Sequence, residues 1–407
     1  MRFLILFTCF ALVVSANHAT ATESIPLSEQ ITLEFATQEQ AGQTLGKSDS
    51  FTSNQQPLER QIRLQAEKPI SEAQLLEFAS RQALDWNDED RQKIREAVQP
   101  LLVNLKRLDH LLPAQVGLIK TTGKEEGGAG YCRSNFIILP TKTINQPTPA
   151  VTRILAHELF HILSQHRPDL RRPLYRIIGF VPIEPVDLPQ ALAARRITNP
   201  DAIELNYVLP LHIQRKAAPT AVLPITFSRR ANYEGGSLFA YLDFQLLVLT
   251  KVDDTWVVLM AGGDPVLREP DAVAEFQRAI GRNTSYIIHP EEIMADNFVH
   301  WMLGKQDVPD LWIIQQLEKT LLEPPPKLMA RFPKHHFARE SGRYVPISRL
   351  CMMRRKRISG TRPNACADYT GRAVKIRHHL EFVLYFQTSP GGQGSTQYSI
   401  ANLHQYE

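Results

Sequence analysis

Two histidines, four residues apart in a segment bounded by prolines, constrain this chain more than any other feature of its sequence. His157 and His161 lie between Pro149 and Pro168. Proline is favoured in the first turn of a helix and disrupts its interior, so Thr148 is the expected N-cap and Pro168 the expected stop. Apolar residues recur at near-helical spacing, at Val151, Ile154, Leu155, Ile162 and Leu163. The pattern predicts a helix with both imidazoles on one face, where they could share a metal ion.

A second segment offers a carboxylate that could complete such a site. Pro290 is suited to the start of a helix that ends near Gly304, and Glu292 and Asp296 lie on one face of it, four residues apart. Glu292 could ligate the metal ion, while Asp296 could accept a hydrogen bond from the second ring nitrogen of a ligating histidine and so fix its orientation. Ala295 between them would let the two helices approach closely.

These residues form two motifs that occur together in a known family. His157, Glu158 and His161 make an HExxH sequence, and Glu292 with Asp296 makes ExxxD. The chain resembles the gluzincin metallopeptidases, thermolysin-like enzymes that carry these motifs on separate helices. The resemblance covers about residues 110–320. It implies an α+β, zincin-like fold, with a small sheet, an active-site helix and a helical lower part. It also implies one zinc ion held by the two histidines and Glu292.

The sequence excludes one related class and leaves the third ligand open. Metzincins continue HExxH with a glycine and a third histidine, and here Ser164 and Arg167 stand in those places. The interval between the two helices is longer than in most gluzincins, so Glu291 and Glu234 remain alternative ligands.

The chemistry implied by the resemblance is hydrolysis of a protein or peptide substrate. Zinc lowers the pKa of a bound water to about 7. Glu158 would take the proton of this water as general base and pass it to the departing amine. A neighbouring donor would stabilise the tetrahedral oxyanion, and His289, Tyr286 and Tyr241 are the candidates.

The β-rich parts of the sequence fall before and between the two helices. Strands are predicted over 116–121 and 135–140, and Gly127 to Tyr131 is a candidate rim that pairs with extended substrate, or an ordinary hairpin loop. An antiparallel insertion over about 205–262, with a turn at Asp253 and Asp254, either walls the cleft or only packs against it. Its loop Asn232 to Gly236 is expected to face the site.

The N-terminus has the pattern of a cleaved signal peptide. Arg2 precedes an apolar run from Phe3 to Val14, and Ala19, Thr20 and Ala21 form a small-residue cleavage site. The run is too short to span a bilayer, so we expect no membrane span after cleavage of residues 1–21 and a secreted or periplasmic protein. A polar lead over 22–69 with one strand at 31–35 should precede a catalytic domain over 70–323.

The C-terminal region, 324–407, differs in charge from the rest. After Pro324, Pro325 and Pro326, residues 327–381 contain 14 Lys or Arg and 3 Asp or Glu. No nucleic-acid-binding motif accompanies the charge, which favours a solvated basic extension over a polyanion-binding one. Cys351 and Cys366 could form a disulfide, which leaves Cys132 free or paired between chains.

Two other functions fit the same sequence. A non-catalytic binding protein could retain a gluzincin scaffold, and a cell-envelope adhesion module could act through the basic region. The oligomeric state is not predicted.

Overall fold

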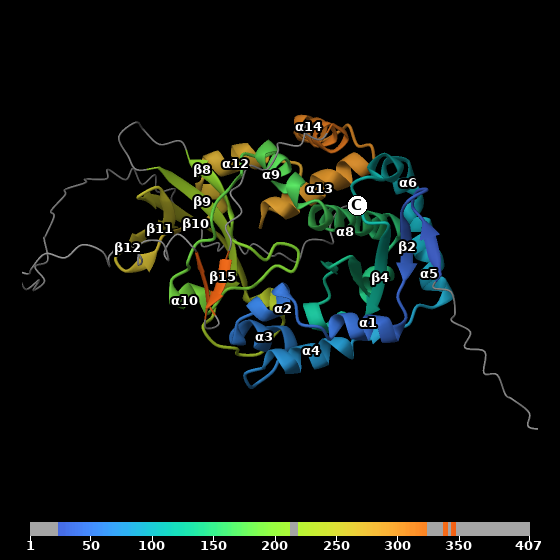
Figure 1. Cartoon of the computed structure of the whole chain (residues 1–407), viewed down its shortest axis with the longest axis horizontal. Coiled ribbons are helices and arrows are strands. Elements are labelled where there is room, and N and C mark those ends of the chain that lie inside the picture. The colour runs from blue at the N-terminus through green and yellow to red at the C-terminus, as the bar shows by residue number, and fades with distance from the viewer. Residues whose placement is uncertain (1–22, 212–218, 324–336, 341–342, 347–407) are drawn as a thin grey trace, which may run out of the picture. The chain divides into compact units, whose positions relative to one another are not determined.

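The computed structural model describes residues 23–211, 219–323, 337–340 and 343–346 (Figure 1). The chain divides into two compact units, 1–324 with 399–407, and 325–398, a boundary at the predicted Pro324. In the second unit, β15 (Phe337–Glu340) and β16 (Arg343–Pro346) pair as an antiparallel hairpin. The predicted signal peptide, Cys351 and Cys366 lie outside the described residues.

The first unit is α+β, and its first sheet is mixed. Its strand order is β1 (Ser24–Pro26), β2 (Thr32–Phe35), β4 (Gln115–Thr121), β6 (Phe136–Pro140) and β5 (Tyr131–Arg133), and β3 (Ala83–Leu84) also pairs with β4. The strands β2, β4 and β6 are parallel, whereas β1, β3 and β5 run antiparallel to their neighbours. The strands predicted over 116–121 and 135–140 are thus confirmed as β4 and β6.

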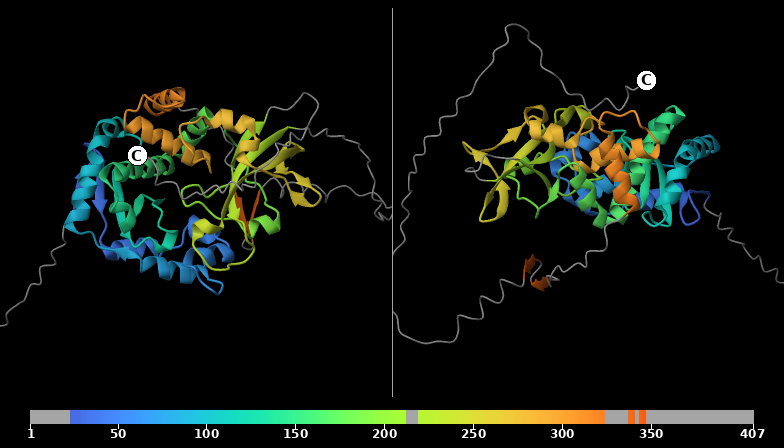
Figure 2. Two further views of the ribbon diagram at one scale, coloured as in Figure 1. Left: turned by 180° about the vertical axis from the view of Figure 1, so that it is seen from behind. Right: turned by 90° about the horizontal axis from the view of Figure 1, so that it is seen from above.

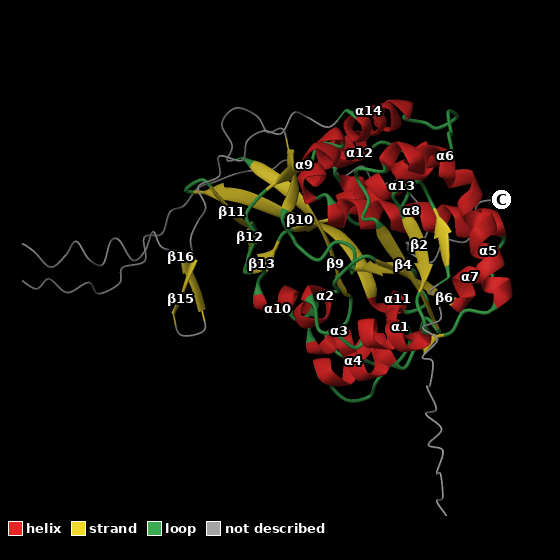
Figure 3. Ribbon diagram, turned by 45° about the vertical axis from the view of Figure 1, so that its right-hand side comes forward, coloured by secondary structure: helices red, strands yellow, loops and turns green. Residues whose placement is uncertain are grey.

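Helices cover both faces of this sheet because its central strands alternate between two cores. Leu118 and Ile137 point into the main core with α5 (Asp88–Val98) and α8 (Thr148–His166). Ile119 and Ile138 point to the opposite face, which is covered by α1 (Gln38–Leu45) and α4 (Glu72–Ser80). Figure 3 shows the two helical groups on either side of the strands.

The segment 22–69 is not a loose polar lead. It supplies β1, β2, α1, α2 (Ser50–Asn54) and α3 (Pro57–Leu64). Its polar residues serve as helix caps: Thr37 and Asp49 each form a capping box with the residue three positions later. The strand predicted at 31–35 is confirmed as β2. The prediction of a loose chain around it was wrong, because these polar side chains form hydrogen bonds at helix ends.

A second sheet, entirely antiparallel, follows α8 in the sequence. Its order is β11 (Thr255–Val258), β10 (Leu242–Val252), β9 (Thr220–Ser228), β8 (Tyr207–Leu211) and β7 (Val181–Pro182), and β14 (Leu267–Arg268) also pairs with β10. The predicted turn between β10 and β11 is confirmed, since Asp253 and Asp254 both have positive φ, 47° and 62°. A helical turn, α11 (Leu238–Tyr241), directly precedes β10.

The second sheet packs against the helical half of the unit through one face. Val222 and Leu246 belong to the main core, while Leu223 and Leu247 belong to a separate core on the other face. The inserted β unit is therefore integrated with the rest, as the two views of Figure 2 show.

The remaining helices complete the main core around α8. They are α9 (Pro168–Ile177), α12 (Ala274–Ile280), α13 (Pro290–Met302) and α14 (Leu311–Leu322). The helix α13 packs against both α8 and α14. Shorter elements are α6 (Leu102–Leu105), α7 (Thr141–Ile144), α10 (Gln190–Ala193), β12 (Met260–Ala261) and β13 (Asp264–Pro265), with 3-10 turns at Gln99–Leu101, Lys106–Leu108, Lys124–Glu126 and Pro270–Ala272.

Among the described residues, no helix combines the length and the apolar character needed to cross a membrane.

Candidate metal centre

Both predicted histidine ligands project from α8. The helix begins at Thr148, with Pro147 as N-cap, so the predicted start was one residue late. It ends at His166, two residues before Pro168. His157 and His161 lie one turn apart, with ring centroids 4.7 Å apart and planes at 80°. Both contact carboxylates of α13, the helix that packs against α8.

The helix α13 brings Glu292 between the two imidazoles. It starts at Pro290 as predicted, with His289 as N-cap. Glu292 Oε2 lies 3.0 Å from His157 Nε2 and 3.5 Å from His161 Nε2. One ligand atom from each of these three side chains falls within 4.8 Å of the others. The predicted third ligand thus lies beside the histidines despite a separation of 135 residues from His157.

The spacing of these atoms fits a bound metal ion. Zinc binds imidazole nitrogen and carboxylate oxygen at about 2.0–2.2 Å, so two ligand atoms at a tetrahedral angle lie about 3.3 Å apart. The two nitrogen-to-oxygen distances, 3.0 Å and 3.5 Å, lie on either side of this value. Two imidazoles and one carboxylate leave a coordination position for water or substrate. The three residues could therefore hold a metal ion without rearrangement of the helices.

Each histidine is oriented by a separate carboxylate on its other ring nitrogen. Asp296 Oδ1 lies 3.0 Å from His157 Nδ1 and Glu291 Oε1 lies 2.9 Å from His161 Nδ1. The predicted position of Asp296 is matched by the structure. Glu291, considered above as an alternative ligand, instead contacts the nitrogen that faces away from Glu292. Such carboxylate partners fix the imidazole tautomer and raise its basicity as a ligand.

Several residues hold these carboxylates, and the sequence did not indicate them. Glu291 Oε2 accepts hydrogen bonds from Ser164 Oγ, at 2.9 Å, and from the Tyr175 hydroxyl. Asn199 Nδ2 donates to Glu292 Oε1 at 2.6 Å, which leaves Oε2 facing the histidines. Ser164 could have been found, since it lies three residues after His161 on the same helix face. Asn199 lies in a loop with no periodic pattern to indicate its partner.

The pKa values reflect the close approach of the imidazoles and carboxylates. Burial lowers the pKa of His157, but hydrogen bonds to Asp296 and Glu292 outweigh this effect and raise it to about 10. Burial likewise acts to raise the pKa of Glu292, yet the charges and hydrogen bonds of His161 and His157 hold it well below its usual value. A metal ion binds neutral imidazole, so it would compete with the proton that this environment favours on His157.

The predicted general base, Glu158, lies on α8 beside the edge strand of the first sheet. Cys132 Sγ donates to Glu158 Oε2 at 3.2 Å, and Asp201 is near both, with one ligand atom from each of the three within 4.8 Å of the others. A Cβ on Gly130 would lie 3.3 Å from Glu158 Oε1, so glycine at this position preserves space beside the carboxylate. Burial raises the pKa of Glu158, and the positive charges of His161 and His157 oppose the rise.

Cys132 itself is a free, buried cysteine among the residues that the structure describes. It lies in β5, directly after the segment Gly127 to Tyr131 that was a candidate substrate rim. Among the described strands β5 pairs only with β6. Its other edge is the sheet edge nearest Glu158.

The three candidate oxyanion donors lie in different places. Tyr286 has its ring centroid 6.1 Å from that of His157. His289 caps α13, and its Nδ1 accepts the Glu291 N–H at 3.0 Å. Burial lowers its pKa to about 4. Tyr241 is not brought to the centre: its hydroxyl donates to the Gly235 carbonyl in a separate apolar cluster.

Two other expectations are not met. Glu234 pairs with Arg230 at 3.0 Å on the surface and is not a ligand. The loop Asn232 to Gly236 does not face the centre, because Tyr233 stacks on Tyr241 in that same apolar cluster. The loop that does reach the centre is the one that contains Asn199 and Asp201.

No protein-family model matches the chain, and neither a curated protein nor a solved structure is significantly similar to it. The chemistry of the centre therefore follows from its own residues.

Proposed function

We propose that this protein is a zinc-dependent peptidase of the gluzincin type, with a zincin-like catalytic core, that acts outside the cytoplasm. The observation that carries the proposal is the convergence of His157, His161 and Glu292, with Asp296 and Glu291 each holding one histidine by its other nitrogen. Two imidazoles and a glutamate form a typical donor set of catalytic zinc in peptidases. The extracytoplasmic location rests on the predicted signal peptide.

Zinc in this centre would supply a Lewis acid and a water acidified to a pKa of about 7. Glu158 accepts the proton of the attacking water at its carboxylate and delivers it to the departing amine. Gly130 leaves room at Oε1 for this transfer, while the Cys132 thiol holds Oε2. Tyr286 and His289 flank the centre and are the candidates to donate a hydrogen bond to the oxyanion.

Substitution of the base and of the third ligand should separate hydrolysis from metal binding. Glu158→Gln is expected to keep one zinc ion and lose peptidase activity by a factor of about 100 or more, because it removes only the proton acceptor. Glu292→Ala is expected to lose most of the zinc as well. Zinc is measured by mass spectrometry of the purified protein, and activity by release of peptides from an unfolded protein substrate.

Glu29→Gln, an exposed residue in the same chain, is the matched control and should behave as wild type. Equal activity in all four proteins would contradict the proposal. Zinc bound by the wild type with no hydrolysis of any peptide would instead favour the non-catalytic binding protein.

A further inference from the structure

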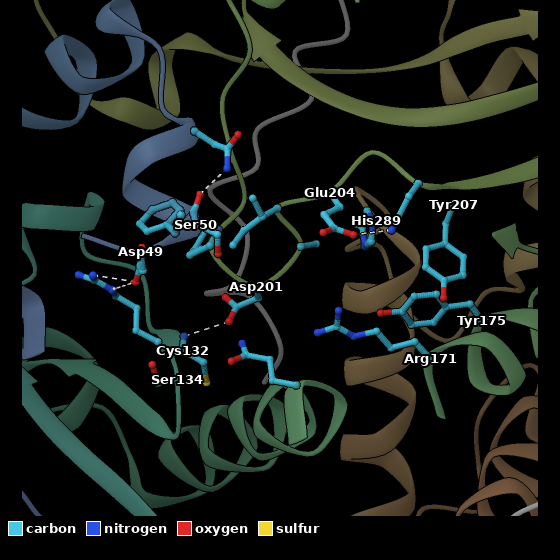
Figure 4. Close-up of a pocket in the computed structure, with 18 residues that line it drawn as sticks. Asp49, Ser50, Cys132, Ser134, Arg171, Tyr175, Asp201, Glu204, Tyr207 and His289 are labelled. Carbon is cyan, nitrogen blue, oxygen red and sulfur yellow. Dashed lines mark hydrogen bonds and ion pairs between the residues drawn. The ribbon is translucent and has the colours of Figure 1, made fainter. Parts of the chain in front are cut away.

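A cavity of about 370 Å³ adjoins the proposed general base. Cys132 and Asp201 are part of its wall, and the Cys132 thiol contacts Glu158 directly. The opposite wall is formed by Arg171 and Tyr175 of α9, by Tyr207 of β8 and by His289 (Figure 4). A peptide held for attack beside Glu158 would therefore have room for one of its residues in this cavity.

Two arginines line the cavity, Arg133 and Arg171, and within the described part of the chain only Arg133 forms an ion pair. Arg133 binds Asp49 at 2.7 Å and the carbonyl oxygens of Leu45 and Lys47. Arg171 forms no ion pair with any residue that the structure describes; its Nε donates to Ser164 Oγ at 3.0 Å. In Figure 4 the Arg171 side chain runs past Tyr175, and its guanidinium extends into the cavity towards the side of Asp201.

The contact with Ser164 fixes how the guanidinium is presented. Because Nε is used, the two terminal nitrogens remain for a ligand, and they form a planar fork that matches the two oxygens of a carboxylate. Ser164 Oγ in turn donates to Glu291, which holds His161. A single chain of hydrogen bonds thus joins the cavity wall to a metal ligand and keeps the fork at a defined position relative to the centre.

Acidic residues lie on both sides of the cavity. Asp201 lies at the Cys132 side, where its Oδ1 accepts the Cys132 N–H at 3.0 Å, and Glu204 is exposed. Glu204 lies beside His289 on the Arg171 side of the cavity (Figure 4), and Arg171 supplies the positive charge of that wall. The His289 ring beside it is uncharged at neutral pH, since burial lowers its pKa to about 4.

We propose that this cavity is a substrate subsite in which Arg171 binds a carboxylate of the peptide, so that peptides with an acidic side chain or a free C-terminus near the cleaved bond are preferred. The inference rests on the proposed peptidase function and specifies its substrate class.

The test compares peptides that differ only in one carboxylate. A single Glu or its neutral isostere Gln is moved through each position on both sides of the cleaved bond, and a second pair has a free or an amidated C-terminus. A charged hydrogen-bonded pair should give the wild type a preference of about tenfold or more in kcat/KM for one carboxylate position. A preference for Glu over Gln at one position would mean that Arg171 binds an acidic side chain. A preference for the free over the amidated peptide would mean that it binds the C-terminal carboxylate.

Arg171→Gln should bring the ratio between charged and neutral peptide close to one, and Arg171→Lys should restore part of it, since charge is kept without the fork. The adjacent exposed Arg172 provides the matched control, and Arg172→Gln should retain the wild-type ratio. Zinc content is measured for each variant, because Arg171 also contacts Ser164.

A binding measurement keeps the two proposals separable. Zinc-loaded Glu158→Gln protein should bind the carboxylate peptide about tenfold more tightly than its neutral partner by fluorescence polarisation, and lose this difference when combined with Arg171→Gln. If wild type and Arg171→Gln both hydrolyse peptides with the same ratio of kcat/KM between charged and neutral peptide, the subsite proposal is overturned and the peptidase proposal stands. Carboxylate-selective binding without hydrolysis would overturn the peptidase and leave the subsite.

Discussion

Each candidate ligand histidine uses one ring nitrogen toward Glu292 and the other toward a carboxylate of its own. The two carboxylates are held differently: Asp296 accepts from Thr284 as well as His157, whereas Glu291 accepts from Ser164, Tyr175 and His161. Glu291 is fully buried, and both of its carboxylate oxygens accept hydrogen bonds from these neighbours. Among the residues that do not bind the metal ion, Glu291 is therefore the one whose substitution should disturb the centre most.

Glu291→Gln is expected to weaken zinc affinity about 10- to 100-fold while all three ligands remain. The amide has one oxygen where the carboxylate has two, so Ser164 and Tyr175 or else His161 lose their acceptor. Competition with a chromogenic chelator measures the affinity, and Glu29→Gln is again the control. Unchanged affinity would show that Glu291 does not orient His161.

At the scale of elements, the centre depends on how closely α8 and α13 pack. Ala295 is fully buried in the core that these helices share, which agrees with its predicted role as a small residue at a close approach. A larger side chain here would have to move one helix away from the other. The ligands on the two helices would then separate even though none of them has changed.

Ala295→Leu should lower the free energy of unfolding by about 1–3 kcal/mol through overpacking and should also weaken zinc binding. Urea unfolding and the chelator competition measure the two effects. Ala274→Leu, at the exposed first residue of α12, adds the same side chain without burying it. This variant should change neither the free energy of unfolding nor the zinc affinity. Loss of stability with full zinc affinity would mean that the helix spacing does not control the centre.

The two site helices could be predicted from the sequence, whereas their surroundings could not. Proline at their boundaries and apolar periodicity are local signals, and they located α8 and α13 to within a residue or two at their starts. Asn199 contacts Glu292, which lies 93 residues further along the chain, and no local pattern specifies such a pair. The helices of 38–64 were missed because their cap residues resemble a solvated chain.

At the scale of the whole molecule, the centre joins parts that are otherwise far apart in sequence. The helix α8 lies on the first sheet, α13 belongs to the helical group, and Asn199 comes from the connection between β7 and β8 of the second sheet. This loop is itself anchored to α3, where the buried pair Arg63 and Glu59 binds Thr198. A metal ion would therefore stabilise the folded unit as a whole and not only its ligands.

Removal of zinc by a chelator should lower the thermal midpoint of the wild type by on the order of 10 °C, since a ligand at 1,000 times its Kd stabilises a protein by about 4 kcal/mol. Glu158→Gln should shift by the same amount, because it retains the ligands. Glu292→Ala should already have the thermal midpoint of the chelator-treated wild type, and the chelator should not lower it further. A wild-type midpoint that ignores the chelator would exclude a tightly held ion.

The long interval between the ligands also has a consequence for how the protein matures. Glu292 follows His157 by 135 residues, so at about 5–20 residues per second a ribosome needs roughly 10 s to make the third ligand after the first two. Contacts between such distant segments form late in folding, since chain entropy opposes their closure. We therefore expect the metal ion to be acquired after the second sheet has folded, and a newly made chain to remain inert until then.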